Sequence, residues 1–278
     1  MMVVTGATGN VGGPLVRALD AAGERVTAVS RGTSATGAAD LPAGVRHVRA
    51  DLADPVSLRP ALDGAEALFL LVTGEFLASG GDLSGVLGTA RDTGVRRVVL
   101  LSSQGVGTRR HPPGQEEAVK RSGLEWTLLR PAGFHSNTLV WAGTVRAART
   151  AGAPFGDVAL PTVDPLDIAE VAALALREPG HAGMTYELTG PAPVSPRQQV
   201  AAIADAVGEP VRFVEQTREE ARAQMLRFMP EPVADTTLDI LGTPVAEEQR
   251  VSPDVERLLG RPGHAFTHWA GRNAAAFK

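Results

Sequence analysis

The sequence predicts an α/β protein with a doubly wound parallel sheet, followed by a smaller, partly helical C-terminal lobe. Three observations favour this fold class. Short apolar runs of strand length alternate with segments of helical periodicity through the first half of the chain. The run 67–72 is continuously apolar, as in a strand that is buried on both faces. A glycine-rich turn over residues 5–13 joins the first strand to the first helix.

The first half contains six expected strands. They are the short apolar runs at residues 3–4, 25–29, 45–49, 67–72, 95–101 and 125–129. Helices are expected between them, where apolar residues recur three and four positions apart, at residues 14–22, 56–62, 82–93 and 116–121. Pro14 suits a first helical turn, and Gly23 and Gly94 each end a helix.

The second half is less regular. Helices are expected at residues 167–176, 195–207, 217–228 and 266–277, and strands at 184–188 and 211–215. Asp167 with Glu170 predicts a capping box at the start of the first of these helices. The segment Pro230-Glu231-Pro232 is expected to end the third helix.

Composition excludes several classes of protein. A net charge of −4 with 21% charged residues does not provide a broad basic surface for nucleic acid. No apolar run has the length of a membrane helix, and the start lacks the pattern of a secretory signal. Cysteine is absent, so neither a disulfide framework nor a thiolate site is available. We expect a cytoplasmic protein whose partner is a small molecule.

The loop Gly6-Ala7-Thr8-Gly9-Asn10-Val11-Gly12 lies where a phosphate-binding turn is found, between a strand and a helix. Its first glycine permits a tight turn, its second lets the backbone approach a pyrophosphate, and its third lets helix and strand pack closely. The helix N-terminus offers free N–H groups to the anion. The loop therefore predicts a Rossmann-type dinucleotide site, with an ordinary turn as the alternative. The expected contacts are Gly6, Thr8, Gly9, Asn10, Val11 and Gly12.

The spacing Gly-x-x-Gly-x-x-Gly resembles that of the extended and atypical short-chain dehydrogenase/reductases. Later motifs narrow the resemblance to the NmrA-like atypical group. They are Val98-Val99-Leu100-Leu101-Ser102-Ser103, Ser122-Gly123-Leu124-Glu125-Trp126-Thr127-Leu128-Leu129-Arg130-Pro131, Val163-Asp164, Asp167-Ile168-Ala169 and Tyr186-Glu187-Leu188-Thr189-Gly190. The resemblance covers essentially the whole chain. It implies an NAD(P)-binding Rossmann domain at residues 1–150 and a substrate-binding lobe at 151–278, packed on the first domain.

The end of the second strand indicates which cofactor binds. NAD-binding domains carry an acidic residue about 20 residues past the loop, whereas this strand ends in Ser30-Arg31. An arginine there can bind a 2′-phosphate, so NADP(H) is expected; a solvated surface arginine is the alternative. The resemblance further implies that Asp51 and Leu52 line the adenine, although Asp51 could equally form a turn. It also implies cofactor contacts from four further residues, which are Val72, Thr73, Ser102 and Pro131.

The usual catalytic pair of the superfamily is missing. Classical members use a tyrosine and a lysine four residues apart, whereas the only tyrosine, Tyr186, is followed four positions later by Gly190. Glu116 and Lys120 have the same spacing, but we interpret them as an ion pair on a helix surface. Carbonyl reduction by the usual route is therefore not expected, whereas cofactor binding is.

Other residues could carry the proton. His135 follows the sixth strand and titrates near neutrality, so we expect it to face the nicotinamide as the proton donor. Ser102 and Ser103 follow the fifth strand and are either catalytic or turn residues. His111 is expected to be exposed rather than catalytic, and no cluster has metal-ligand spacing.

The substrate is expected to contact Phe134, His135, Asn137 and Trp141. The apolar residues Phe134, Leu139, Trp141, Phe155, Met225 and Phe228 either line a pocket or form plain core. A pocket of this kind suits a flat, apolar molecule. We therefore expect an NADPH-dependent oxidoreductase acting on a quinone, enone, azo or related acceptor. The alternatives are a non-catalytic NADP(H) redox sensor and an isomerase or dehydratase that uses the cofactor as an aid.

Overall fold

The computed structural model describes residues 1–32, 41–74, 76 and 80–278. The contacts between residues divide the chain into two units, each made of two segments. The first unit is Met1–Pro131 with Pro165–Glu187, and the second is Ala132–Asp164 with Leu188–Lys278. The sequence-based division at residue 150 differs from this arrangement, because the chain returns to the first unit for one helix and one strand after it has begun the second.

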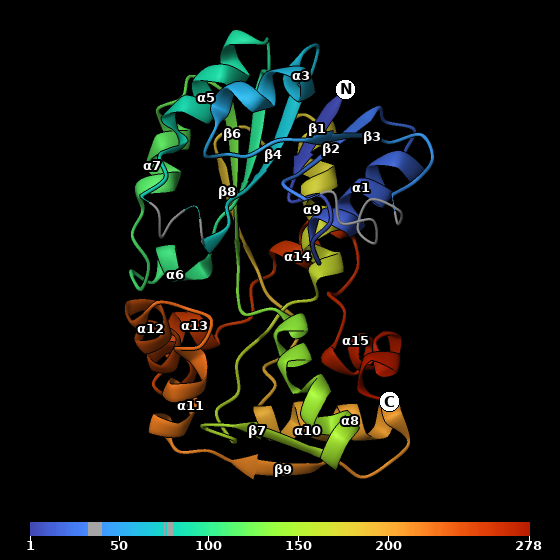
Figure 1. Ribbon diagram of the computed structural model, residues 1–278, viewed down its shortest axis with the longest axis vertical. Coiled ribbons are helices and arrows are strands. Elements are labelled where there is room, and N and C mark those ends of the chain that lie inside the picture. The colour runs from blue at the N-terminus through green and yellow to red at the C-terminus, as the bar shows by residue number, and fades with distance from the viewer. Residues whose placement is uncertain (33–40, 75, 77–79) are drawn as a thin grey trace. The chain divides into compact units, whose positions relative to one another are not determined.

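The first unit is built on a seven-stranded sheet with the order β3-β2-β1-β4-β5-β6-β8 (Figure 1). The strands are β1 (Met2–Thr5), β2 (Val26–Ser30), β3 (Arg46–Arg49), β4 (Ala67–Leu71), β5 (Arg97–Leu101), β6 (Glu125–Pro131) and β8 (Met184–Leu188). Each pair of neighbours from β3 through β6 is parallel. The expected Rossmann-type fold is thereby confirmed.

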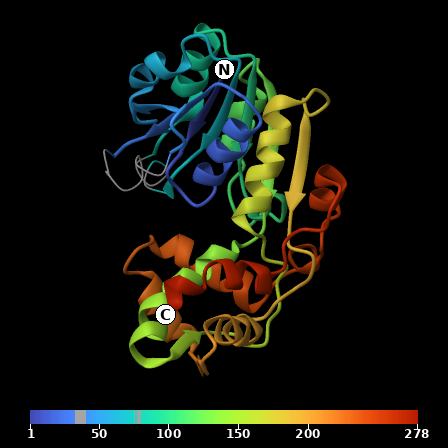
Figure 2. The ribbon, with the colours of Figure 1, turned by 90° about the vertical axis from the view of Figure 1, so that its right-hand side faces the viewer.

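Helices cover both faces of this sheet. On one face, α1 (Gly12–Ala21) packs beside α9 (Pro165–Arg177), as Figure 2 shows in blue and yellow. The other face carries the 3-10 helix η1 (Pro55–Leu58) and the helices α3 (Arg59–Leu62), α5 (Leu83–Asp92) and α7 (Gly114–Lys120). Leu68 and Leu70 of β4 belong to the core on this second face. Phe69 points to the opposite face, since successive strand residues alternate.

Two local predictions for this unit need correction. Helix α9 begins at Pro165, so Asp167 lies inside the first turn, where it is fully buried, rather than at the expected N-cap position. The short helix α6 (Gln104–Gly107) was not among the expected helices. Ser103 caps it by accepting a hydrogen bond from the backbone N–H of Gly105.

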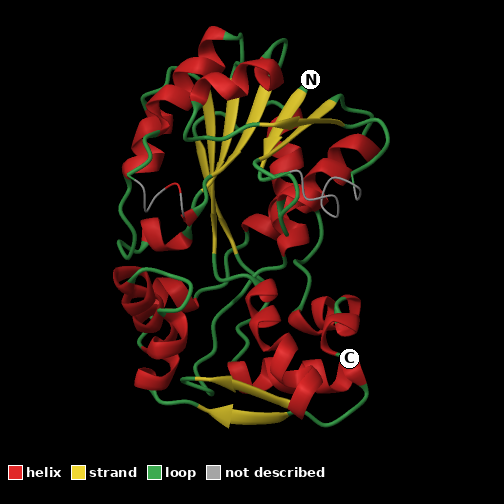
Figure 3. Ribbon diagram, in the orientation of Figure 1, coloured by secondary structure: helices red, strands yellow, loops and turns green. Residues whose placement is uncertain are grey.

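The second unit combines a small sheet with many helices (Figure 3). Its strands β7 (Thr150–Ala153) and β9 (Arg212–Glu215) pair in parallel. Its helices are η2 (His135–Trp141), α8 (Ala142–Ala148), α10 (Pro196–Val207), α11 (Arg218–Met225), α12 (Glu231–Gly242), α13 (Ala246–Gln249), α14 (Asp254–Leu259), α15 (Phe266–Arg272) and η3 (Ala274–Phe277). The core contains Val145, Ile203, Trp269 and Phe277. Within the described residues, no helix is both long and apolar enough to cross a bilayer.

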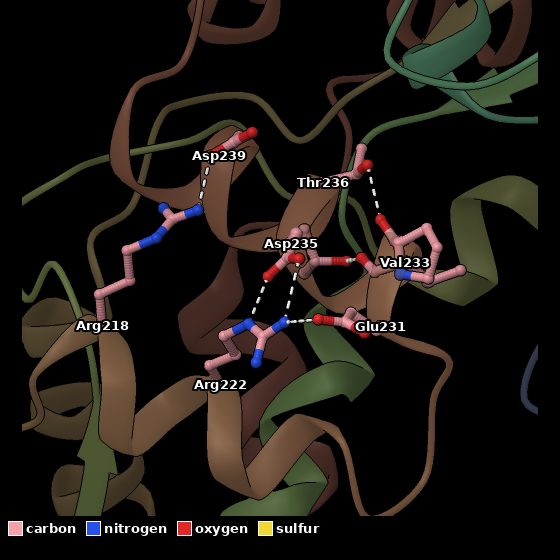
Figure 4. A network of polar contacts seen from close by, with 9 residues as sticks. Arg218, Arg222, Glu231, Val233, Asp235, Thr236 and Asp239 are labelled. Carbon is pink, nitrogen blue, oxygen red and sulfur yellow. Dashed lines mark hydrogen bonds and ion pairs between the residues drawn. The ribbon is translucent and has the colours of Figure 1, made fainter.

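Ion pairs join α11 to α12 (Figure 4). Arg222 binds Asp235 through two hydrogen bonds of 2.6 and 3.2 Å and also binds Glu231, while Arg218 binds Asp239 at 2.7 Å. Helix α11 ends at Met225 rather than at the expected Phe228, before the proline segment is reached. The segment Pro230-Glu231-Pro232 instead starts α12, because Pro232 lies in the first turn, where proline needs no N–H partner. This helix start was not predicted.

Candidate functional site

The parallel strands of the first unit end together at one edge of the sheet. They end at Thr5, Ser30, Leu71, Leu101 and Pro131. The glycine loop and most of the other expected cofactor residues follow these positions directly. Open α/β sheets bind ligands at this edge, where the strand order reverses. The fold therefore collects the expected cofactor residues of the first unit on the side of the sheet that suits them.

The glycine loop has the geometry of a close-approach turn. Gly6 adopts a φ of +63°, which side chains other than glycine rarely accept. A Cβ at Gly12 would overlap the carbonyl oxygen of Gly6 and lie 2.7 Å from its carbonyl carbon. A Cβ at Gly9 would lie 3.2 Å from the same oxygen. The loop is thus folded tightly on itself, and Gly12 is required by backbone contact alone.

Thr5 attaches this loop to the neighbouring strand β4. Its hydroxyl donates to the carbonyl of Phe69 at 3.1 Å and accepts from the backbone N–H of Leu71 at 2.8 Å. The side chain of Leu71 in turn lies 3.1 Å from the place that a Cβ of Gly6 would take. These contacts fix the two strand ends that flank the point where the strand order reverses.

Basic residues surround the end of β2. Ser30 lies opposite Arg49 of β3, and the Nε of Arg49 donates to the carbonyl of Arg31 at 3.0 Å. Arg31 and Arg49 are both exposed. The hydroxyl of Ser30 lies 2.8 Å from Nε2 of His47. Arg49 and His47 could not be recognised from the sequence, because only the parallel pairing of β2 with β3 places them beside Ser30 and Arg31.

The next expected cofactor residues also have structural roles. The carboxylate of Asp51 accepts from the backbone N–H of Ala53 at 3.0 Å, as in a turn. Leu52 and Val72 pack against the core of the first unit. The hydroxyl of Thr73 accepts from the backbone N–H of Phe76 at 3.3 Å. These contacts leave the cofactor roles of the four residues as predictions.

A buried carboxylate lies behind the end of β5. Glu116 is 1% exposed, and Arg130 binds it through two hydrogen bonds of 2.8 and 2.6 Å. Ser102 donates its hydroxyl proton to the same carboxylate at 2.7 Å, and the ammonium of Lys120 lies 3.8 Å away. The interpretation of Glu116 and Lys120 as a pair on a helix surface was wrong for Glu116, because Arg130 and Ser102 allow its charge to be buried.

The pKa of Glu116 reflects this network. Burial raises the pKa, but hydrogen bonds from Arg130 and Ser102 and the nearby positive charges outweigh it, and the pKa lies below its ordinary value. Glu116 therefore stays ionised near neutrality. Because the one hydroxyl proton of Ser102 points to Glu116, Ser102 is left as a hydrogen-bond acceptor.

Ser103, the next residue, contacts a histidine. Nδ1 of His111 lies 3.1 Å from the hydroxyl oxygen of Ser103. His111 is half-buried, whereas the sequence analysis expected it to be exposed. The difference arises because the loop after α6 folds back, with the backbone N–H groups of Arg110 and His111 both donating to the carbonyl of Gly105.

His135 lies in the core of the second unit. It is 1% exposed, with Nδ1 at 2.9 Å from the hydroxyl of Thr162 and Nε2 at 3.2 Å from the carbonyl oxygen of His264. Phe266 packs edge-on against its ring at 5.2 Å between centroids. The expectation of an accessible histidine here is not met, because both ring nitrogens are engaged inside this unit.

The other expected substrate residues differ in exposure. Trp141 is buried in the core of the second unit and donates its indole N–H to the carbonyl of Gly152 at 2.9 Å. Phe134 is half-buried and Asn137 is exposed. Trp141 therefore takes the core role that the sequence analysis left open, and contact of Phe134 and Asn137 with a substrate stays a prediction.

Among the described residues, Asp164, His264 and His268 bring three potential metal ligands within 4.8 Å of one another. The two imidazoles are stacked, with 12° between their planes and 4.7 Å between centroids. A metal ion lies near the plane of each imidazole that binds it, so two stacked rings cannot point at one ion. Asp164 is also paired with Arg272. This arrangement fits a histidine stack beside an ion pair better than a metal centre.

The single tyrosine has a structural partner. Tyr186 is 3% exposed, and its hydroxyl lies 2.8 Å from Nδ1 of His181. Burial, with a smaller effect of the Arg97 charge, keeps the pKa of His181 below its ordinary value, although the nearby Glu178 carboxylate acts in the opposite direction. Tyr186 lies within β8 rather than at the strand ends that carry the glycine loop.

Comparisons with known proteins agree with these features. The family model for NAD(P)H-binding proteins matches residues 6–179. The chain is 37% identical to (4-alkanoyl-5-oxo-2,5-dihydrofuran-3-yl)methyl phosphate reductase of Streptomyces griseus, over 100% of this chain and 99% of that protein. It is 33% identical to NAD(P)H azoreductase of Xenophilus azovorans, again over 100% and 99%.

Solved structures share the fold. The NADPH complex of a quinone oxidoreductase from Escherichia coli gives a TM-score of 0.80 at 24% identity, covering 98% of this chain and 99% of that one. The NAD complex of NmrA, a negative transcriptional regulator, gives 0.73 at 19% identity, covering 97% and 94%. The fold that the NmrA-like resemblance implied is thereby confirmed.

Proposed function

The chain belongs to the NAD(P)H-binding family, and from this premise we propose that it is an NADPH-dependent reductase of a small, apolar, electron-poor acceptor. Two relatives that match over the whole length are named as reductases of an alkanoyl dihydrofuranone phosphate and of azo compounds. The substrates that these names describe contain a conjugated carbon–carbon double bond or a nitrogen–nitrogen double bond, either of which can accept a hydride. Such acceptors do not need the tyrosine that polarises a simple carbonyl, and this chain lacks the Tyr–Lys pair.

The glycine loop is the observation that carries the proposal. A Cβ at Gly12 would collide with the loop backbone, and a Cβ at Gly9 would lie 3.2 Å from the carbonyl oxygen of Gly6, so this turn is built for close approach. We assign the pyrophosphate to the backbone of residues 9–12 and the N-terminus of α1. Arg31, with Arg49 beside it, would bind the 2′-phosphate, and Thr73 and Ser102 would lie along the ribose and nicotinamide side.

The chain's own residues then prepare the reaction. Bound NADPH would supply a hydride, which is one hydrogen with two electrons, to the acceptor. Ser102, whose proton is held by Glu116, can accept a hydrogen bond from a ribose hydroxyl or the carboxamide and so orient the nicotinamide. Glu116 and Arg130 act on the cofactor only through Ser102 and are positioning residues. His135 is assigned to holding the loop after β6 rather than to proton transfer.

The proposal is tested by NADPH oxidation with a panel of acceptors: a quinone, an azo dye and an unsaturated lactone. We expect oxidation of NADPH at 340 nm to depend on at least one of the three, with NADPH preferred to NADH. NADPH binding without turnover of any acceptor would contradict the reductase and favour the redox sensor. Turnover that is equally fast with both cofactors would contradict the assignment of Arg31.

A further inference from the structure

We propose that Ser103 and His111 form the proton relay of the reductase, taking the place of the missing tyrosine. The inference rests on the proposed function, since it supplies the proton that must accompany the hydride. Ser103 would donate to the acceptor, and His111 would replace the proton of Ser103. His111 is outside the residues that the sequence analysis placed in the site.

The position of Ser103 suits this role. Ser103 follows β5 by two residues, so it lies at the sheet edge that carries the glycine loop. Its neighbour Ser102 cannot donate, because its proton is committed to the ionised Glu116. The hydroxyl oxygen of Ser103 instead accepts from the backbone N–H of Gly105 at 3.1 Å and lies 3.1 Å from Nδ1 of His111. Two N–H groups can thus point at this oxygen, which leaves its own proton for the acceptor.

The backbone holds the imidazole of His111 in place. The carbonyl of Gly105 accepts from the N–H groups of Arg110 and His111 at 2.8 and 2.9 Å, which closes the loop against α6. A Cβ at Gly105 would lie 2.5 Å from Nδ1 and 2.7 Å from Cε1 of His111. The ring therefore occupies space that is available only because residue 105 is glycine. The lack of a side chain at Gly105 and the capping of α6 by Ser103 are separate features, and both fix the positions of Ser103 and His111.

The acceptor gains a hydride at one atom of its double bond and a proton at the conjugated oxygen or nitrogen. The O–H bond of Ser103 breaks toward the acceptor, while Nδ1–H of the His111 imidazolium gives its proton to the oxygen of Ser103. Ser103 ends unchanged, and His111 ends as neutral imidazole. Solvent then returns one proton to His111, so the net change is reduction by two electrons and two hydrogens.

Three variants test the relay with an unsaturated lactone as acceptor. His111→Gln cannot carry the proton and should lower kcat by about 10²–10³-fold, a typical contribution of general acid catalysis, with NADPH affinity unchanged. Gly105→Ala keeps both relay residues but displaces the ring, so it should lower kcat in the same way. His268→Gln removes an exposed histidine of the second unit and serves as the control with unchanged kcat.

Chemical rescue separates proton transfer from mere support of the loop. Added imidazole should restore part of the rate of His111→Ala but none of the rate of Ser103→Ala. Only Ser103→Ala lacks the hydroxyl group through which the proton passes to the acceptor. NADPH titration by tryptophan fluorescence shows whether each variant keeps its fold. Nitrogen-15 NMR of the free protein should show a protonated Nδ1 of His111 whose shift changes in Ser103→Ala.

The outcomes distinguish the two proposals. A wild type that is active while His111→Gln keeps its rate contradicts the relay and leaves the reductase standing. The same holds if Nδ1 of His111 is unprotonated at every pH at which the enzyme works. A wild type that oxidises NADPH with none of the acceptors contradicts the reductase and the relay together.

Discussion

Glu116 and Arg130 form a two-point ion pair in which the carboxylate is almost completely shielded from water, with side chains 2% and 20% exposed. The pair lies directly behind Ser102, which donates to the same carboxylate. A buried charge of this kind is tolerated only with full hydrogen bonding, and removal of one partner leaves the other uncompensated. The stability of the first unit and the orientation of Ser102 therefore depend on the same contact.

Glu116→Gln should destabilise the protein by about 3 kcal/mol, since it leaves Arg130 partly buried without a counter-ion. Urea unfolding followed by circular dichroism measures the effect. Glu117→Gln is the matched control on the same helix, because Glu117 pairs with Arg121 on the exposed surface. The control should change stability by less than about 1 kcal/mol. Equal losses of unfolding free energy in both variants would show that the burial of Glu116 does not contribute to stability.

The stabilising effect of Glu116 should depend on pH in one direction. Its pKa is lower in the folded protein than the ordinary 4.5, so the folded state favours the ionised form. Its contribution is then fully present above 4.5 and is lost as pH falls through the folded pKa. The difference in unfolding free energy between wild type and Glu116→Gln should be constant near neutrality and shrink in acid. A difference that grows in acid would contradict the direction of the shift.

Arg31→Ala should weaken NADPH binding by about tenfold or more and leave NADH binding nearly unchanged. A hydrogen bond to a charged group contributes roughly 1.5–3 kcal/mol, and about 1.4 kcal/mol is tenfold in affinity. Arg49→Ala should act in the same direction, since Arg49 lies opposite Ser30. Titration of tryptophan fluorescence with each cofactor gives both constants. Equal losses of affinity for NADPH and NADH would contradict the assignment of the 2′-phosphate to this site.

Gly12→Ala should abolish NADPH binding, because the new methyl group would collide with the backbone of Gly6 and Ala7 and open the loop. Gly88→Ala is the control, as Gly88 lies in α5 with open space around the position of its Cβ. That substitution should stabilise the protein by about 0.5–1 kcal/mol and leave binding intact. Calorimetric titration of both folded variants decides the comparison.

His135→Gln should lower stability more than turnover. Glutamine cannot reproduce both ring contacts, to Thr162 and to the carbonyl of His264, nor the packing on Phe266. We expect a loss of about 1–3 kcal/mol, typical of a buried polar group left unsatisfied, with kcat within a few-fold of wild type. A fall in kcat of a hundredfold or more at unchanged stability would return His135 to the role that the sequence alone suggested.

The sequence was sufficient for the parts of the fold that depend on local pattern. The strands of the first unit, the glycine loop and the parallel sheet follow from periodicity, from Gly6 and Gly12, and from alternation along the chain, whereas β7 of the second unit was not expected. The sites that depend on long-range contact were missed. Burial of Glu116 on α7 needs Arg130 from strand β6, and the fixed position of His111 needs a loop that folds back onto Gly105. The burial of His135 was not foreseen because its partners, Thr162 and His264, lie 27 and 129 residues away in sequence.

The discontinuous first unit has a consequence for synthesis. Helix α9 and strand β8 belong to this unit but are encoded after the segment Ala132–Asp164. A nascent chain that has reached residue 150 therefore holds six strands of the sheet with one face lacking α9 and one edge lacking β8. Until the ribosome has delivered residues 165–188, this apolar face and open edge can meet other nascent chains. We expect early termination at residue 150 to give insoluble polypeptide rather than an independently folded nucleotide-binding fragment.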